Sequence, residues 1–320
     1  MTLRHLQRQL PPAGRSCDAA TMIDRLDHVI VAVRDLRAAA DRYAALLGRE
    51  PSWQGEHPGA GTANVLFRLE NTYVELLAPA GEGPVGKPLR ERLESHGEGL
   101  AGIAFGTPDL PAAVEALRAQ GGSVSDPQPG QGRDAASGAE RRWQNAFLTP
   151  ASSRGPLVFA IQHHSPPEAL PLRAPVEPGG SVFALDHVVV MSADLDASRE
   201  LYHEVLGLRL ALDRSFEARG TRILFFRVGG VTVEVAGPIG GGPDPAAPDR
   251  LFGLAYRVAD AEAAARRISA AGFDVSAVRP GHKPGTRVCT VGDGTAGVPT
   301  LLIEPVADAG ERLPSHGGES

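Results

Sequence analysis

The stretch LDHVIVAVRDLRAAADRYAALLG, residues 26–48, recurs 159 residues later as LDHVVVMSADLDASRELYHEVLG, residues 185–207. The alignment continues without gaps, so that GTANVLFRLENTYVELLAP at 61–79 matches GTRILFFRVGGVTVEVAGP at 220–238. The two copies share 18 identities over 54 positions. A fixed period of this kind marks a duplicated structural unit. The two halves of the chain should therefore fold alike.

A fainter copy of the same pattern lies inside each half, at residues 100–122 and 251–272. Each unit has a short apolar run, an Asp that can cap a helix, an Ala-rich amphipathic stretch and a terminating Gly. Further apolar runs follow, so one unit reads as a strand, a helix and two or three strands. The sequence predicts an α+β fold in which paired units bury one face of a curved sheet under helices and leave the concave face for a ligand.

The joints between units predict the domain organisation. Residues 1–21 show no periodicity and are expected to be a disordered extension. The first domain should span 22–164 and the second 183–306, separated by a proline-rich linker at 165–182. Residues 307–320 form a loose tail in this interpretation.

Composition excludes several classes of function. The 320 residues are 42% hydrophobic, and Lys+Arg 32 against Asp+Glu 38 gives a net charge of -6, without the basic excess that nucleic-acid binding requires. No apolar run approaches the roughly 18 residues of a membrane span. The two cysteines, Cys17 and Cys289, have no CxxC spacing, which argues against a disulfide framework or a thiolate metal site. We expect a soluble cytoplasmic protein, a monomer or homodimer, whose partner is a small molecule.

Two polar pairs stand within apolar strands. His28 and Glu75 are separated by 47 residues, and His187 and Glu234 repeat that spacing. A buried unpaired carboxylate is costly, and an imidazole together with a divalent cation is one efficient partner for it. This pattern points to a metal site in one or both halves.

The opening-strand pattern LDHVIVAVRDL and the strands TYVELLAP and VTVEVAGP resemble those of the vicinal oxygen chelate superfamily, the group of glyoxalase I, bleomycin and fosfomycin resistance proteins and extradiol dioxygenases. The first domain is most similar to its glyoxalase-like branch. The resemblance implies paired βαβββ modules that form a cupped mixed sheet with helices outside, and metal ligands supplied by the first and last strand of each module.

For the second domain the resemblance implies the ligands His187, Glu234 and Glu304. Gly253 stands where many metal-dependent relatives have a second histidine. Three protein ligands with open positions still suit a catalytic divalent transition metal, which would be Mn, Fe, Zn, Ni or Co. Either Glu234 or Glu304 would act as the catalytic base.

For the first domain the resemblance implies a weaker second site made of His28, Glu75 and Gln162, with Gly102 in the place of the histidine. His163 directly follows Gln162 and is interpreted as linker surface together with its neighbour His164. Whether each cup forms within one domain or by exchange of modules stays open.

The leading function is therefore a glyoxalase-like, metal-dependent lyase or isomerase that acts on a small metabolite chelated through neighbouring oxygens. Arg279, His282 and Arg287 could bind an anionic group of that substrate. The first alternative is a metal-free binding protein of bleomycin-resistance type, since glycines at the cup floor enlarge a cavity. The second alternative is an extradiol-type dioxygenase, for which one histidine is missing.

Overall fold

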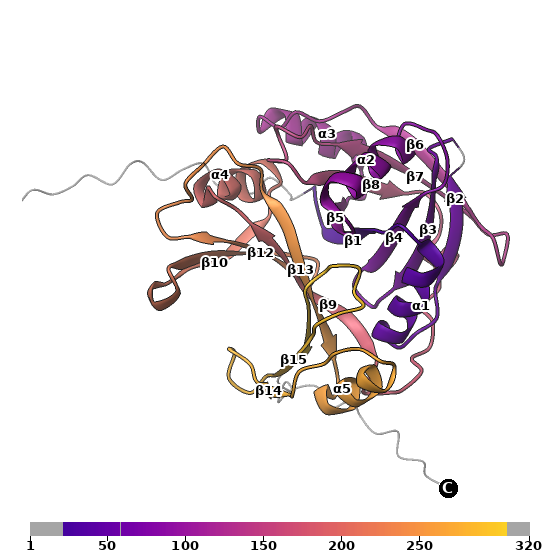
Figure 1. The fold of residues 1–320 in the computed structure, drawn as a ribbon. Helices are drawn as coiled ribbons and strands as arrows, with labels where there is room; N and C mark the ends of the chain where they lie inside the picture. Colours follow the sequence, from indigo (N-terminus) through magenta and orange to yellow (C-terminus); the bar gives the residue numbers. More distant parts are fainter. Residues whose placement is uncertain (1–21, 58, 306–320) are drawn as a thin grey trace, which may run out of the picture.

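The computed structural model describes residues 22–57 and 59–305, and its strands form two curled sheets (Figure 1). The predicted extension before residue 22 and the predicted tail from 307 lie outside the described residues. The first sheet is a closed barrel with the strand order β1-β4-β3-β2-β6-β7-β8-β5. Its strands are β1 (Arg25–Ala32), β2 (Trp53–His57), β3 (Thr62–Arg68), β4 (Tyr73–Pro79), β5 (Gly99–Gly106), β6 (Gln128–Asp134), β7 (Glu140–Phe147) and β8 (Leu157–His163).

The second sheet has eight strands in the order β10-β11-β12-β9-β13-β16-β15-β14. They are β9 (Val182–Met191), β10 (Arg209–Phe216), β11 (Thr221–Val228), β12 (Val231–Pro238), β13 (Arg250–Val258), β14 (Arg279–Pro280), β15 (Arg287–Val291) and β16 (Thr300–Glu304). The helices are α1 (Leu36–Leu47), α2 (Gly86–His96), α3 (Leu110–Ala119), α4 (Leu195–Arg199), the π-helical η2 (Glu200–Val205) and α5 (Ala261–Ala270). Short 3-10 turns are η1 (Pro167–Ala169) and η3 (Glu217–Arg219).

The pairing of the strands confirms the predicted α+β fold of tandem modules. Within a module the first and last strands are parallel neighbours, as β1 with β4 and β9 with β12. The two modules of one sheet join through antiparallel first strands, β1 with β5 and β9 with β13. Each cup is therefore built within one half of the chain, and modules are not exchanged between the halves.

Aspartates begin the helices as the sequence indicates. Asp35 accepts a hydrogen bond from the Ala38 backbone N–H, and Asp109 does the same for Ala112. Gly48 ends α1 in the left-handed conformation with φ 67°. The third module departs from the pattern, because the helix after Asp194 is α-helical for five residues and then continues as the π-helix η2.

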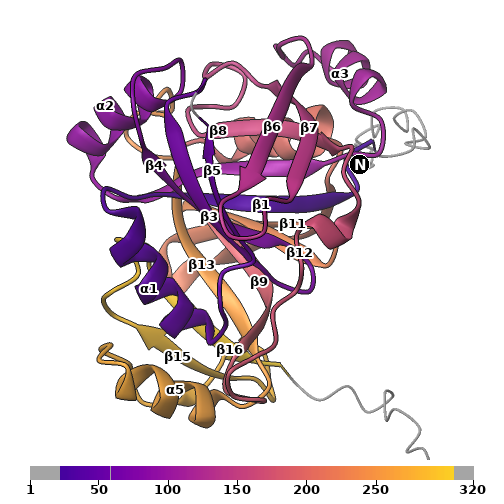
Figure 2. The ribbon, with the colours of Figure 1, turned by 90° about the vertical axis from the view of Figure 1, so that its right-hand side faces the viewer.

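One hydrophobic core spans both sheets. Alternation places Val29 and Val31 on one face of β1, and Val188 and Val190 on one face of β9. All four side chains are fully buried in one cluster. Figure 2 looks onto the barrel, with the second sheet behind and below it, and α5 lies below α1 in this view. Arg267 of α5 donates to backbone carbonyls at the end of α1. The two sheets thus fold around shared apolar side chains.

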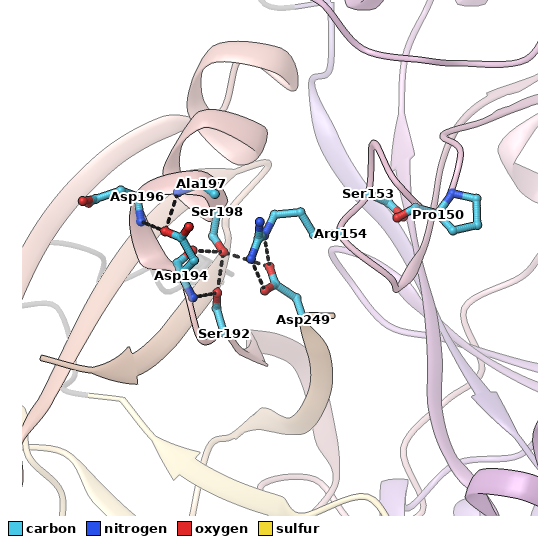
Figure 3. Close-up of polar contacts among 9 residues, drawn as sticks. All are labelled: Pro150, Ser153, Arg154, Ser192, Asp194, Asp196, Ala197, Ser198 and Asp249. Atoms are coloured by element: carbon cyan, nitrogen blue, oxygen red, sulfur yellow. Dashed lines mark hydrogen bonds and ion pairs between the residues drawn. The ribbon is translucent and has the colours of Figure 1, made fainter. Parts of the chain in front are cut away.

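A buried ion pair joins the halves at a second place (Figure 3). Arg154, in the loop between β7 and β8, donates to both carboxylate oxygens of Asp249 at 3.2 and 3.3 Å. The Asp249 side chain has no solvent exposure and also accepts a hydrogen bond at 2.8 Å from the Ser198 hydroxyl of α4. This contact fixes the start of β13 against the barrel.

No helix among residues 22–57 and 59–305 is long and apolar enough to cross a membrane.

Candidate functional site

A β-bulge brings an aspartate to the side of the neighbouring histidine in each half. In a regular strand consecutive side chains point to opposite faces. The register between β1 and β5 shifts at Asp27, because Leu26 pairs with Phe105 and His28 already pairs with Ala104. The same shift occurs at Asp186 between β9 and β13.

In the barrel, Asp27 is the centre of a buried polar chain. Its Oδ1 lies 2.9 Å from His28 Nδ1 and 3.0 Å from His163 Nε2. The other ring nitrogen of His28 lies 3.4 Å from Glu75, whose second oxygen accepts a hydrogen bond from Asn64 at 2.7 Å. His28 is 3% exposed, so this chain of groups lies inside the protein.

The surroundings of Asp27 favour its charged form. Burial alone would raise its pKa, but the hydrogen bonds and charges of His163 and His28 hold the pKa well below its usual range. Arg25 contributes a further contact, with Nε 3.3 Å from Asp27 Oδ2. Tyr73 stacks on the His28 ring at 4.5 Å, and its burial, together with the Asp27 charge, raises its pKa well above 10.0.

A pocket of about 400 Å³ opens above this chain at the end of the barrel. Its lining includes the polar side chains Arg25, Asp27, Arg68, Tyr73, Arg141 and His163 and the apolar side chains Leu69, Pro166, Pro167 and Leu170. The residues from Pro166 onward belong to the segment that connects the two sheets. The predicted proline-rich linker therefore forms one wall of the pocket.

The second sheet repeats the aspartate–histidine pair in a more open setting. His187 Nδ1 lies 2.9 Å from Asp186 and 3.6 Å from Glu234, and their side chains are 14%, 26% and 21% exposed. Arg257 donates to Asp186 at 2.7 Å. Although burial opposes it, hydrogen bonds from His187 and Arg257 lower the Asp186 pKa to about 2, whereas burial raises the pKa of Glu234.

The residues present do not fit the complete metal site of the resemblance. Glu75 is opposite Ile30 in the parallel register of β1 and β4. The equivalent position in β5 and β8, opposite Ala104, is held by Phe159. In the second sheet the equivalent of Glu234 is likewise Leu301.

The second module of each sheet therefore has glycine and an apolar residue at the positions that histidine and glutamate occupy in the first module. Among residues 22–57 and 59–305, no group of three His, Cys, Asp or Glu side chains is arranged to hold a metal ion.

The structure separates Glu304 from His187 and Glu234. His187 of β9 pairs with Ala255 of β13, which pairs in turn with Leu301 of β16. Glu304 lies three residues beyond Leu301 along β16. Its carboxylate instead accepts a hydrogen bond at 2.9 Å from the Ala261 N–H at the start of α5. The predicted grouping of these three side chains is thus corrected, because Glu304 serves the helix side of the sheet.

Gln162 is displaced in the same way. It accepts a hydrogen bond from the Leu110 N–H at 3.0 Å and donates to Pro108 O at 2.6 Å, at the start of α3. It is therefore not part of a site with His28 and Glu75. The next residue, His163, ends β8 on the pocket side, so the interpretation of His163 as linker surface is also corrected.

The three predicted substrate-binding residues of the second domain do not gather at Asp186. Arg279 lies exposed in β14, and His282 lies 3.4 Å from Arg219. Arg287 is paired with Glu262 at 2.7 Å and with Glu304 at 3.4 Å.

The class of this protein is defined by its tandem curled sheets of paired modules, in each of which a histidine lies close to a glutamate. The chain belongs to the glyoxalase/bleomycin resistance protein/dioxygenase superfamily, as the resemblance implied. The family described as "Glyoxalase-like domain" matches residues 26–180. A second family, described as "Glyoxalase/Bleomycin resistance protein/Dioxygenase superfamily", matches residues 186–290.

One relative is similar in sequence to part of this chain, and two solved structures are similar in fold. The chain is 38% identical over 104 residues to an ethylmalonyl-CoA/methylmalonyl-CoA epimerase of Cereibacter sphaeroides, covering 32% of this chain and 75% of that protein. A mutant 4-hydroxymandelate synthase from Streptomyces coelicolor has a similar fold, with a TM-score of 0.65, 17% identity and coverage of 88% of this chain and 92% of that chain. A Mn(II)-bound glyoxalase from Novosphingobium aromaticivorans superposes with a TM-score of 0.56 at 18% identity, covering 89% and 83%.

Proposed function

We propose that the barrel pocket binds a small molecule and that His163, held by Asp27, moves a proton to or from a carbon beside a carbonyl group of that molecule. The observation that carries this proposal is the Asp27–His163 contact of 3.0 Å at the wall of a pocket of about 400 Å³. A histidine oriented by a buried carboxylate is a common arrangement for general acid–base catalysis.

The chemistry follows from the contacts of the pair. His163 points Nε2 at Asp27, which leaves Nδ1 for the substrate. The ionised Asp27 stabilises the imidazolium that forms when Nδ1 accepts a proton. The guanidinium groups that line the pocket stabilise the negative charge that then develops on the substrate carbonyl oxygen.

One further finding favours proton transfer without a resident metal, and a second agrees with proton transfer itself. Phe159 and Gly102 occupy the second-module positions in the barrel, so arginines are the electrophilic groups available there. The similarity to an epimerase agrees with this type of reaction, because inversion of a carbon centre beside a carbonyl requires removal and return of a proton.

The experiment that tests the proposal follows hydrogen exchange by NMR. We expect the protein to accelerate replacement of the C3 hydrogens of 2-oxobutanoate by deuterium in D2O, equally with and without EDTA. His163→Gln and Asp27→Asn should each slow this exchange by about a hundredfold. His164→Gln, which alters the exposed neighbouring histidine, is the matched control and should keep the wild-type rate. Equal rates in wild type and His163→Gln would refute the proposal.

A second candidate function is binding without chemistry. The barrel interior below the pocket is packed with apolar side chains, including Ile30, Leu77, Phe159 and Ile161, which leaves only its mouth for a ligand. In that case a ligand would raise the melting temperature while no substrate hydrogen exchanged.

A further inference from the structure

Arg141 differs from the other arginines of the barrel pocket. It stands on β7, opposite Gly132 of β6, and is 7% exposed. Arg25 pairs with Asp24 and Asp27, and Arg68 donates to the backbone carbonyls of Pro167 and Leu170. By contrast, no carboxylate in the described part of the chain lies within ion-pairing distance of the Arg141 guanidinium.

The neighbours of Arg141 hold it in place without neutralising it. Its guanidinium carbon lies 5.5 Å from the centre of the Tyr73 ring and 5.6 Å from that of Trp53. These rings orient the cation by cation–π attraction but carry no net charge. Taking a guanidinium out of water is costly unless an anion compensates it, and Arg141 lines the pocket.

We infer that Arg141 binds the carboxylate of a small carboxylic acid, which names the substrate class of the proposed function and rests on it. The planar fork of a guanidinium matches both oxygens of a carboxylate.

Two features of the lining favour a monocarboxylate over a phosphate. Asp27 and Glu70 share the lining, and their negative charges disfavour a dianion. Leu170, Pro166 and Pro167 offer apolar surface for a short hydrocarbon or aromatic body. Arg141 is therefore a specificity-determining residue.

The test compares three probes on the full-length protein by calorimetry and ligand-observed NMR. Benzoate carries the carboxylate, benzamide has the same shape without the charge, and inorganic phosphate carries the charge without the apolar body. We expect benzoate to bind at least about tenfold more tightly than benzamide and phosphate. Arg141→Gln should remove this preference, and Arg141→Lys should retain part of it.

Arg142→Gln is the matched control, because Arg142 is the next residue along β7 and its side chain is 71% exposed. It should bind benzoate like the wild type. Thermal unfolding and the circular dichroism spectrum of each variant establish that the variants fold. If Arg141→Gln does not fold, the comparison is made with Arg141→Lys. An undiminished preference of Arg141→Gln for benzoate would overturn the inference. The absence of any benzoate binding by the wild-type protein would also overturn it.

The outcomes also separate this inference from the proposed function. Phosphate binding as tight as that of benzoate shows that the pocket selects charge alone, and the carboxylate assignment fails. Arg141-dependent benzoate binding together with normal hydrogen exchange in His163→Gln leaves the carboxylate site standing and removes the catalytic role. Hydrogen exchange that needs His163 but does not change in Arg141→Gln removes the carboxylate site instead.

Discussion

At the scale of single residues, Asp186 links the protein's charge state to its stability. Its pKa of about 2 lies below the ordinary 3.8, so its stabilising contacts are present above about pH 4 and are lost as the pH falls towards 2. The side chain is 26% exposed, and solvent screening limits the contribution to about 1–2 kcal/mol. We expect Asp186→Asn to lower the free energy of unfolding by this amount at pH 7 and to have little effect at pH 2.

Urea unfolding at both pH values measures this difference. Glu94→Gln, on the exposed face of α2, is the control and should leave the free energy of unfolding unchanged at either pH. A loss of stability in Asp186→Asn that is equal at both pH values would mean that packing, rather than charge, explains the role of Asp186.

The sequence predicted some site residues and missed others for definable reasons. Strand alternation correctly placed His28 and Glu75 on one face, because that part of the pattern depends only on counting by two. Asp27 was missed because a β-bulge breaks this count and nothing in the letters LDHV marks it. His163 was missed because it follows Gln162 on an alternating strand, and only the register shows which of the two faces the pocket.

At the scale of the elements, each sheet brings one arginine to its bulged aspartate, but the arginine comes from a different strand in each sheet. In the barrel it stands on β1, and in the second sheet it stands on β13. Arg25 of β1 is paired across the sheet with Gly106 of β5, and the equivalent pair in the second sheet is Ala184 with Arg257. A side-chain carbon added at Gly106 would lie 2.6 Å from the Arg25 side chain, so the arginine fills the space that the glycine leaves. Both arrangements bring a guanidinium to the bulged aspartate.

This equivalence predicts that the arginine can be moved between strands. Arg257→Ala should lower the free energy of unfolding by about 1–2 kcal/mol and raise the pKa of Asp186, because a partly buried carboxylate loses its partner. Arg257→Ala combined with Ala184→Arg should restore at least half of that stability. NMR titration of Asp186 and urea unfolding measure both effects, with the exposed Arg209→Ala as control. If the double variant is no more stable than Arg257→Ala, the positions are not equivalent.

The internal repeat was sufficient to predict the modules, but not how each sheet closes. In the first sheet β2 pairs with β6 through Gly55 and Glu56, which completes a barrel. In the second sheet β14 has only two residues and β10 pairs with β11 alone, so the sheet stays open. These contacts join segments far apart in the chain and leave no periodic pattern, which explains why the repeat did not distinguish a barrel from an open cup.

At the scale of the whole molecule, the two sheets share one hydrophobic core and should unfold together. Apolar side chains of both halves, such as Val31 and Val190, are fully buried in the same cluster. The Arg154–Asp249 ion pair joins the two halves at a second place, and its carboxylate is wholly removed from solvent. Removing one partner of a buried pair leaves a charge without compensation, which costs about 3–5 kcal/mol.

We therefore expect Arg154→Met to lower the free energy of unfolding by about 3 kcal/mol while urea unfolding stays a single transition. Adding Asp249→Asn should destabilise the protein by less than the sum of the two single changes, since the second change removes the uncompensated charge. Arg118→Met, which breaks an exposed pair with Asp126, should have little measurable effect. Two separate unfolding transitions in Arg154→Met would show that this ion pair, rather than the shared core, couples the two sheets.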